Sequence, residues 1–324
     1  MKNIALLLAF FFAFGLVNAQ STLDKKEMKE LKKKFQVYDQ GKIFKKAKRI
    51  ALPGVNLRFK LASKESITDG KHQEQVKYSS WAMLDGIEDA DFQEITNEFQ
   101  SMLEEKFTKF GLEIAPCSEY KDNKGYAKLI EKNTKKRLTV KKTWGAAKVF
   151  SADERPFFVY PMSPLGPHAK FAKTADALIA NIHLTIDFAY IGIEADRYRD
   201  YAYEYRSATS RIVPVIRIEG MTENQLQVRT DGSYVNIIKD QTDAHALTLA
   251  SEYSSELEYA TKIESCEGCM PKFAESGFVD IFRSGNVTGT YRVTADKARF
   301  KAAVLDVLDK YTDDWFHIYS THRK

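Results

Sequence analysis

The chain has 324 residues, with 49 Lys/Arg against 44 Asp/Glu and a formal net charge of +5. This length is enough for one large domain or two smaller ones, each with a core of its own. The positive charge is concentrated in residues 20–49, which hold 11 Lys/Arg and four Asp/Glu, whereas residues 50–324 carry a net charge of −3. The body therefore gives no electrostatic reason to bind nucleic acid, and we expect no nucleic acid partner.

Residues 1–19 have the composition of a secretory signal peptide. One lysine precedes an unbroken apolar run, and Val17-Asn18-Ala19 has the small and modest residues that signal peptidase accepts, which predicts cleavage after Ala19. The apolar run is short for a membrane span, so a retained anchor is the less favoured alternative. No cysteine stands at the predicted cut, so nothing indicates a lipoprotein. We expect an exported protein that is periplasmic, outer-membrane-associated or extracellular.

The residues after the predicted cut, 20–49, are expected to form a basic amphipathic helical arm. Asp24 and Glu27 have the spacing of a capping box, which favours a helix start. Four apolar side chains then share one helical stripe: Met28, Leu31, Phe35 and Tyr38. Two interpretations stay open for the helix over 24–38. In the first, the helix contacts a membrane surface or an acidic partner. In the second, which we favour, it packs on its own domain.

The first part of the body, residues 50–324, predicts strands around one long helix. A strand over 50–61 is interrupted by Pro53-Gly54, and the polar residues 63–75 are expected to form a loop. The helix over 91–110 begins with a capping box of Asp91 and Glu94. Gly111 follows it, where a left-handed cap is needed.

The rest of the body predicts mostly strands. Residues 118–146 are strongly polar and are expected to leave the core, with a short helix near 126–130. A strand over 155–162 and a helix with Pro167 in its first turn lead into an alternating strand over 178–192. Further strands follow, two of them joined by a hairpin turn at Asp231-Gly232, and a helix from about Asp296 closes the chain. The expected class is α+β, with a mixed, largely antiparallel sheet and helices packed on one face.

Three segments in this order resemble a known domain. They are the strand over 50–57, the helix end and strand over 110–114, and the segment 174–179 that opens the long strand. The pattern resembles the small α/β domain of the curli secretion channel (CsgG-like) family and of the amino-terminal domain of the TolB periplasmic proteins. The resemblance implies a periplasmic or outer-membrane-associated assembly or interaction module without catalytic residues. The chain departs from the channel family in lacking a lipid-bearing cysteine and in its extra segment 118–146.

The cysteines are Cys117, Cys266 and Cys269, an odd number for an oxidising compartment. A local disulfide between Cys266 and Cys269 is the favoured interpretation, and pairing of Cys117 with one of them is the alternative. Redox or zinc chemistry is less favoured, since the chain has no second CxxC motif to complete a tetrahedral zinc site. We therefore expect no metal and no cofactor.

The alternating strand carries the first pair of candidate binding residues, His183 and Asp187. With Asn181 and Thr185 they occupy the face opposite the apolar one. Four residues of extended chain separate His183 from Asp187 by about 13 Å, too far for the direct contact of ~2.6–3.2 Å that a catalytic pair needs. We expect these polar residues to be half-solvated and too dispersed for chemistry, so we assign no catalytic residue.

A second candidate is the segment "DRYRDYAYEYRS", whose tyrosines and arginines are typical of interfaces and can also stack on a sugar. Its candidate binding residues are Arg197, Tyr198, Arg199, Tyr201, Tyr203 and Tyr205. We favour a non-enzymatic envelope protein that binds other envelope or secreted proteins. The alternative is a secreted carbohydrate-binding or small-ligand-binding protein, or a hydrolase, in which His183, Asp187 and the Tyr/Arg segment converge in a cleft.

Overall fold

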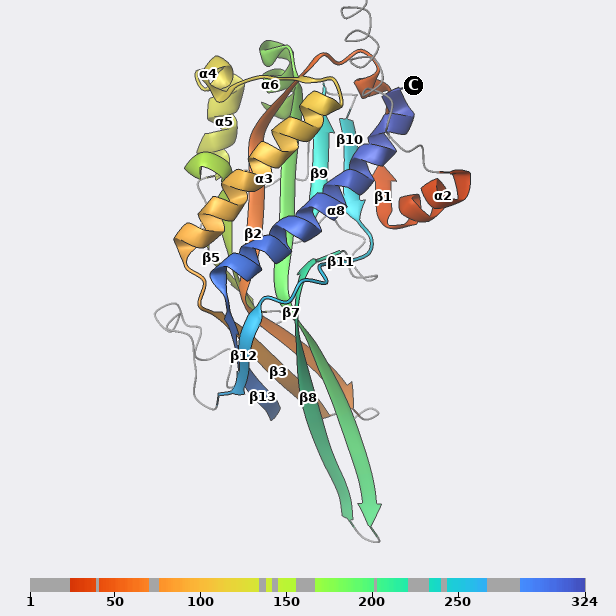
Figure 1. Cartoon of the computed structure of the whole chain (residues 1–324), viewed down its shortest axis with the longest axis vertical. Helices are drawn as coiled ribbons and strands as arrows, with labels where there is room; N and C mark the ends of the chain where they lie inside the picture. Colours follow the sequence, from red (N-terminus) through yellow and green to blue (C-terminus); the bar gives the residue numbers. More distant parts are fainter. Residues whose placement is uncertain are drawn as a thin grey trace, which may run out of the picture.

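The computed structural model describes residues 24–38, 41–69, 76–133, 138–141, 145–155, 167–200, 203–220, 233–239, 244–266 and 286–323. The expected signal peptide, most of the strand over 155–162 and the Asp231-Gly232 turn lie outside the described residues. The molecule is elongated, with a helix-covered sheet at one end and a β-hairpin that projects from the other (Figure 1). The expected α+β class with a mixed, largely antiparallel sheet is confirmed.

One sheet joins the described strands, and its main path runs β1-β10-β9-β7-β2-β3-β13-β12. The strands β4 and β6 also pair with β2, β5 pairs with β6, and β8 pairs with β7 and β11. The strands are β1 (Phe35–Tyr38), β2 (Arg49–Asp69), β3 (Val76–Asp85), β4 (Glu113–Ile114), β5 (Leu138–Lys141), β6 (Gly145–Ser151), β7 (Leu178–Asp200), β8 (Tyr203–Ile218), β9 (Tyr234–Ile238), β10 (Ala244–Leu249), β11 (Tyr253–Ser254), β12 (Ala260–Ser265) and β13 (Asn286–Ala295). The helices are α2 (Lys25–Lys33), η1 (Gly41–Phe44), α3 (Asp89–Lys109), α4 (Cys117–Tyr120), α5 (Lys124–Asn133), η3 (Ala152–Glu154), α6 (Pro167–Ala175) and α8 (Lys297–Arg323).

The long helices α3 and α8 cover one face of the sheet and bury the main core. The helix expected from about Asp296 is α8, and its apolar stripe is buried throughout: Phe300, Val304, Val307, Tyr311, Trp315 and Ile318. The rings of Phe107 on α3 and Trp315 on α8 meet edge to face, with centroids 5.6 Å apart. Burial of each large apolar side chain stabilises the fold by about 1.5–3 kcal/mol, so this face is the main source of stability.

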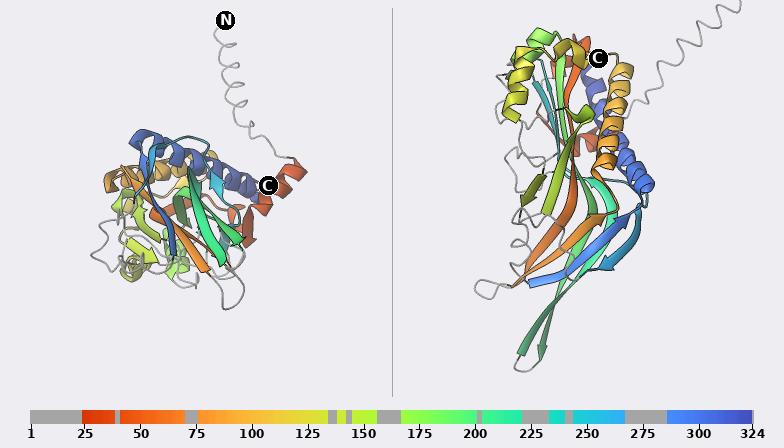
Figure 2. Two further views of the ribbon diagram at one scale, coloured as in Figure 1. Left: turned by 90° about the horizontal axis from the view of Figure 1, so that it is seen from below. Right: turned by 90° about the vertical axis from the view of Figure 1, so that its left-hand side faces the viewer.

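A smaller core lies on the opposite face, under α4, α5 and α6 (Figure 2), so helices cover both faces of the sheet and not the one face expected. Ala51 on β2 and Ile179 on β7 point into it, whereas their neighbours Ile50 and Leu178 belong to the main core. Phe171, Tyr120 and Tyr126 fill the rest of this cluster. The segment expected to leave the core thus returns to the sheet with its aromatic residues. The short helix expected near 126–130 is confirmed as part of α5.

The three segments that carry the family resemblance meet at one end of the sheet. Both β4 and β7 pair with the start of β2 in parallel, with Ile50 opposite Ile114 and Leu178. The expected interruption at Pro53-Gly54 is a shift in the β2/β7 register between Ala51 and Gly54, while β2 itself continues. The family membership stays a prediction.

The basic arm differs from the sequence prediction in its second half. The capping box of Asp24 and Glu27 is present, but the helix ends at Lys33, and Phe35–Tyr38 forms β1 in antiparallel pairing with β10. Phe35 therefore reaches the main core from a strand and not from a helical stripe. Leu31 is also buried in that core and Met28 packs against it, so the arm packs on its own domain.

Two other expectations were wrong, and one strand was missed. Residues 63–69 are not a loop, because β2 continues to Asp69 in antiparallel pairing with β3. The capping box of α3 is formed by Glu88 and Asp91, three residues before the expected one. The buried strand β6 was missed, since its small residues at 145–147 give no strong apolar pattern. Gly111 does adopt the expected left-handed conformation, with φ 86°.

Candidate functional site at the root of the projecting hairpin

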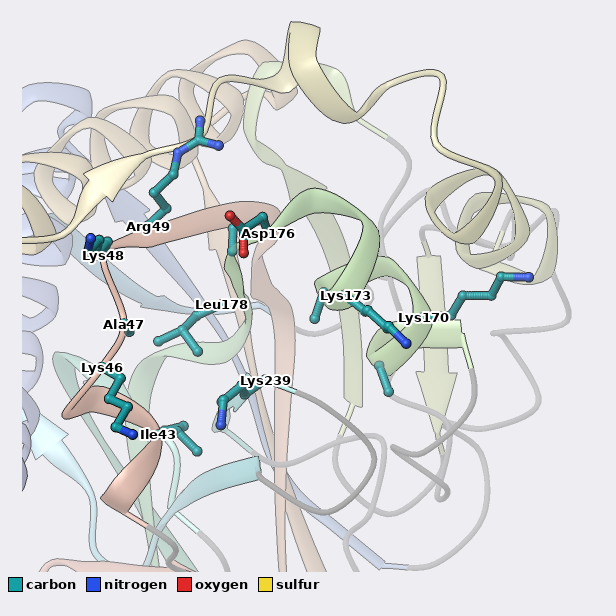
Figure 3. Close-up of a pocket in the computed structure, with 13 residues that line it drawn as sticks. Ile43, Lys46, Ala47, Lys48, Arg49, Lys170, Lys173, Asp176, Leu178 and Lys239 are labelled. Carbon is teal, nitrogen blue, oxygen red and sulfur yellow. The ribbon is translucent and has the colours of Figure 1, made fainter.

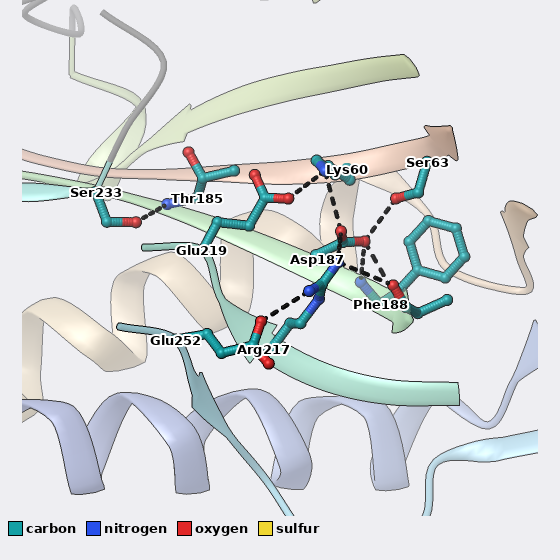
Figure 4. Close-up of polar contacts among 10 residues, drawn as sticks. Lys60, Ser63, Thr185, Asp187, Phe188, Arg217, Glu219, Ser233 and Glu252 are labelled. Atoms are coloured by element: carbon teal, nitrogen blue, oxygen red, sulfur yellow. Dashed lines mark hydrogen bonds and ion pairs between the residues drawn. The ribbon is translucent and has the colours of Figure 1, made fainter. Parts of the chain in front are cut away.

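Asp187 lies at the centre of a compact cluster of charged side chains from three strands (Figure 4). Its Oδ2 accepts hydrogen bonds from Lys60 Nζ on β2 at 3.0 Å and from Arg217 Nη2 on β8 at 2.9 Å. Its Oδ1 accepts from Ser63 Oγ at 2.6 Å and from the Phe188 backbone amide at 2.8 Å. Lys60 also pairs with Glu219, which directly follows β8. The side chains of Lys60 and Asp187 are 6% and 1% exposed, so this is an ion pair inside the protein.

The cluster favours the charged forms of Asp187 and Lys60, whereas burial raises the pKa of Glu219. Burial opposes ionisation of Asp187, but Lys60 and Arg217 outweigh it and lower the pKa of the carboxyl. Burial likewise disfavours the Lys60 ammonium, and the facing carboxylates of Asp187 and Glu219 raise its pKa nevertheless. A carboxylate with a lowered pKa and every oxygen occupied is a poor base, and a lysine with a raised pKa is a poor nucleophile. The arrangement is therefore a structural clamp.

The clamp marks the place where two pairs of strands diverge. The parallel pairing of β2 with β7 ends at Phe59 and Ile186, and beyond it β2 pairs with β3 while β7 pairs with β8. Both strands have a register irregularity there, between Lys60 and Ala62 in β2 and between Asp187 and Ala189 in β7. Bulges bend strands and re-aim side chains, so the clamp fixes the root from which the hairpin projects.

His183 lies on the same face as Asp187 but does not join the clamp. Its ring lies nearly parallel to that of Tyr234, with centroids 5.4 Å apart, and neither ring nitrogen has a hydrogen-bond partner within the described part of the chain. Burial and the nearby charge of Arg58 lower the pKa of His183 well below its ordinary value. The ring is therefore neutral at physiological pH.

The expectation of a half-solvated, dispersed polar face was wrong. Asn181, His183, Thr185 and Asp187 are at most 2% exposed. The neighbouring strands also carry buried polar residues on this side, among them Asn56, Arg58 and Lys60 of β2 and Asn236 of β9. Polar groups on this face contact one another. For example, the Thr185 backbone amide donates a hydrogen bond to Ser233 Oγ at 3.0 Å.

Beyond the clamp, β7 and β8 form a two-stranded hairpin whose tip projects past every other labelled element in Figure 1. The register pairs run continuously from Ala189 with Pro214 to Asp200 with Tyr203. Near the base, Tyr190 and Val213 are directly opposite each other and are 54% and 37% exposed. The Arg217 guanidinium lies 5.8 Å from the centre of the Tyr190 ring, so the clamp contacts the exposed tyrosine.

The Tyr/Arg candidate residues lie at the far end of this hairpin. The register pairs Arg197 with Arg206, Tyr198 with Tyr205 and Arg199 with Glu204, while Asp200 pairs with Tyr203. Tyr201 lies outside the described residues. Fifteen residues of extended strand separate Tyr198 from His183, a distance of about 50 Å. The structure therefore does not bring the two candidate groups into one cleft.

The clamp residues other than Asp187 were missed in the sequence. In β2, Arg58 and Lys60 alternate with apolar residues, and Arg217 and Glu219 do so at the end of β8 and directly after it. That pattern could have marked a buried polar face, since isolated charges in an apolar strand need partners. Which charges meet depends on strand order and the two bulges, which the sequence does not show.

Cys117 is a free thiol and Cys266 is disulfide-bonded. The expected partner, Cys269, lies outside the described residues, so this pairing stays a prediction. Within the described ranges, no group of three or more His, Cys, Asp or Glu side chains is placed to hold a metal ion. No helix among the described residues is long and apolar enough to span a membrane.

Comparison with protein-family models, with curated proteins and with solved structures finds no significant match. The functional argument therefore rests on the geometry of this chain.

Proposed function

We propose that this chain is a non-enzymatic interaction or assembly module of the cell envelope, and that the β7–β8 hairpin docks on a partner protein. The observation that carries the proposal is the projecting hairpin, with the exposed Tyr190/Val213 pair near its base. Export, and hence an envelope location, rests on the composition of residues 1–19. The partner is another envelope or secreted protein.

A hairpin of this kind favours a binding role for physical reasons. Over 194–200 and 203–209, β7 and β8 pair with each other and with no third strand among those described. A two-stranded ribbon alone is marginally stable in water, and each outer edge presents unpaired backbone groups. A partner that adds a strand or an apolar surface would satisfy both deficits.

The clamp supports docking by fixing the base of the hairpin. Arg217 is held by Asp187 and by Glu252, whose Oε2 accepts from Arg217 Nη1 at 2.8 Å. Because the guanidinium lies over the Tyr190 ring, the exposed aromatic has a fixed neighbour before any partner arrives. Binding to a preorganised surface costs less conformational entropy than binding to a loose one.

A small-ligand or hydrolase function on the His183/Asp187 face has less support. Asp187 is fully engaged in the clamp, and the Tyr/Arg segment lies too far away to share a cleft with it. One observation keeps ligand binding open: both amide atoms of Asn181 and both nitrogens of His183 are buried without a partner in the described residues. Binding of a defined sugar or small molecule that His183→Ala abolishes would favour this alternative.

The docking proposal is tested by shortening the hairpin. Residues 194–209 are replaced by Asn-Gly, which joins the register partners Ile193 and Ser210 through a two-residue turn. A photo-crosslinking residue at position 213 captures the partner from envelope extract, and mass spectrometry identifies it. We expect the same partner to be captured by the full-length chain and lost from the shortened one, while both keep the same melting temperature.

A matched control separates docking from general stickiness. Leu257 and Ile263 are also exposed, at 48% and 42%, and neither belongs to β7 or β8. With the cross-linking residue kept at position 213, the variant Leu257→Ser/Ile263→Thr should capture the partner normally, whereas Tyr190→Ser should not. If the shortened chain captures the same protein as efficiently, the docking role of the hairpin is wrong. A cross-link to a second copy would identify the assembly as self-association.

A further inference from the structure

A basic hollow of about 930 Å³ opens at the end of the sheet opposite the hairpin (Figure 3). It lies between η1, the start of β2, the helix α6 and the end of β9. Nothing in the proposed docking function uses it. Its lining combines an apolar floor with a charged rim.

The rim is almost entirely basic. Six of the lining residues carry positive charge and one, Asp176, carries negative charge; the basic residues are Lys46, Lys48, Arg49, Lys170, Lys173 and Lys239. Arg49 is neutralised by Glu113 at 3.1 Å and Glu119 at 2.5 Å. Lys46, Lys48, Lys170 and Lys173 form no ion pair with any residue in the described ranges. Unbalanced cations of this number create a positive potential inside the hollow.

The floor is apolar and well packed. Ile43 and Leu178 are 1% and 3% exposed, and Ala169 and Ala172 of α6 are also buried. In Figure 3 the aliphatic side chain of Leu178 lies between Lys46 and Lys239 on one side and α6 on the other, and the Lys170 side chain of α6 extends away from Leu178. A ligand here would meet hydrocarbon below and ammonium groups around it.

The charges come from three distant parts of the chain. Lys46 and Lys48 belong to the basic arm, Lys170 and Lys173 to α6, and Lys239 to the end of β9. Residues 50–324 are net negative, so Lys170, Lys173 and Lys239 meet at the hollow although their part of the chain has no excess of positive charge. Asp176 follows α6 with a left-handed backbone, φ 47°, an uncommon conformation that turns the chain sharply into β7 at the edge of the hollow.

We propose that this basic hollow binds a phosphate monoester attached to an apolar group. A phosphate monoester carries a charge of about −1.5 to −2 near neutral pH and has three strong acceptor oxygens, which suits several lysines at once. The apolar group would cover Ile43, Leu178 and the alanines of α6. A soluble phosphate ester and the headgroup of phosphatidic acid share this chemistry, and the experiment distinguishes them.

The test measures binding of two probes to the full chain. Naphthyl phosphate is titrated by calorimetry, with naphthol and inorganic phosphate as the two partial ligands. Vesicles of phosphatidylcholine, with and without phosphatidic acid, are used in a flotation assay. The variant Lys170→Glu/Lys173→Glu should weaken binding of whichever probe binds by about tenfold or more, and added salt should weaken binding further.

Two variants with the same charge change serve as controls. Lys121→Glu/Lys128→Glu alters exposed lysines of the segment 118–146 that have no ion pair with described residues. Lys25→Glu/Lys29→Glu alters α2, the helix that could itself contact a membrane. Both should bind the probe as the parent chain does, and near-ultraviolet circular dichroism should show that all three variants fold.

Each binding result either supports or overturns the proposed phosphate-ester site. Binding of naphthyl phosphate that depends on Lys170 and Lys173 supports the site with a soluble ligand, and dependent binding of phosphatidic acid vesicles alone supports a lipid ligand. If neither probe binds, or if a control variant loses as much affinity as the pocket variant, the proposal is overturned. Failure here leaves the docking proposal for the hairpin intact, because the two surfaces lie at opposite ends of the molecule.

Discussion

The Lys60 ammonium lies 3.0 Å from the Asp187 carboxylate, at the place where β7 leaves β2 and continues as the projecting hairpin. Each residue has a second charged partner, Glu219 for Lys60 and Arg217 for Asp187. Buried ion pairs contribute little net stability compared with a well-packed apolar core, but losing one partner is costly. We infer that the pair is there chiefly to fix the direction of the hairpin.

Breaking this pair should therefore destabilise the fold strongly. Lys60→Met leaves the Asp187 carboxylate buried with one cation fewer, and we expect a loss of about 3–5 kcal/mol in the free energy of unfolding by urea. The exposed pair Lys33–Glu30 provides the control, and Lys33→Met should change stability by less than about 0.5 kcal/mol. The double variant Lys60→Met/Asp187→Leu should cost less than the sum of its parts. Strict additivity would show that the two charges do not interact.

A buried histidine should make stability depend on pH. Burial lowers the pKa of His168 on α6 to about 4. Because the folded state binds the proton less tightly than the unfolded state, the contribution of His168 is fully present above about pH 6.5 and is lost as pH falls towards 4. The loss is on the order of 3 kcal/mol, and His168→Gln should remove that part of the pH dependence.

The clamp separates this effect from acid unfolding in general. The pKa of Asp187 is also lowered, so its contribution is present above its ordinary value near 4 and is lost only below it. The decrease in the free energy of unfolding as pH falls below about 4 should therefore remain in His168→Gln. Equal slopes for the parent chain and this variant between pH 6.5 and 4 would contradict the assignment to His168.

Gly145 should tolerate no side chain. It begins β6 opposite Ser63, with φ 112°, and a Cβ there would lie 1.9 Å from the Ala62 carbonyl oxygen. Gly145→Ala should cost more than about 3 kcal/mol, since strain and a backbone clash add together. Gly192 is a matched control within β7, because the nearest atom to its added Cβ is 3.7 Å away. If thermal unfolding shows similar losses for Gly145→Ala and Gly192→Ala, the steric argument is wrong.

Backbone amides of the hairpin should exchange with solvent much faster than amides in the centre of the sheet. The amides of 194–200 and 203–209 belong to a ribbon of two strands, so they should exchange orders of magnitude faster than those of Ile182 and Leu184 in the centre of the sheet. Binding of the proposed partner should slow exchange of the hairpin amides and leave exchange in the centre of the sheet unchanged. Strong protection of the tip in the free chain would contradict the view that it awaits a partner.

The sequence predicted the helices well because their apolar stripes are long and regular. The closing helix from about Asp296 and the helix over 91–110 were both predicted, and the apolar residues of both belong to the main core. The boundaries that failed are those where tertiary pairing outweighs local pattern. Phe35 continues the spacing of the arm helix, yet a partner strand, β10, draws it into β1.

The candidate site was predicted only in part. Asp187 was singled out, but its partners were not, because Lys60 and Arg217 are 127 and 30 residues away in sequence. His183 was expected to be half-solvated because it lies on the polar face of a strand in which polar and apolar residues alternate. Such alternation shows that the two faces of the strand differ, but it does not show what covers each face. The Tyr/Arg segment was recognised as unusual, and only the hairpin register showed that it lies far from His183.

The amino-acid sequence by itself determined the α+β class, the long helices and the concentration of charge in the arm, because periodicity and composition are local properties. The tertiary structure alone decided that a face expected to be solvated is buried, that Lys60 meets Asp187, and that lysines from three segments surround one hollow. These contacts join residues that are distant in sequence. Strand order and two bulges bring them together, and no local pattern encodes either.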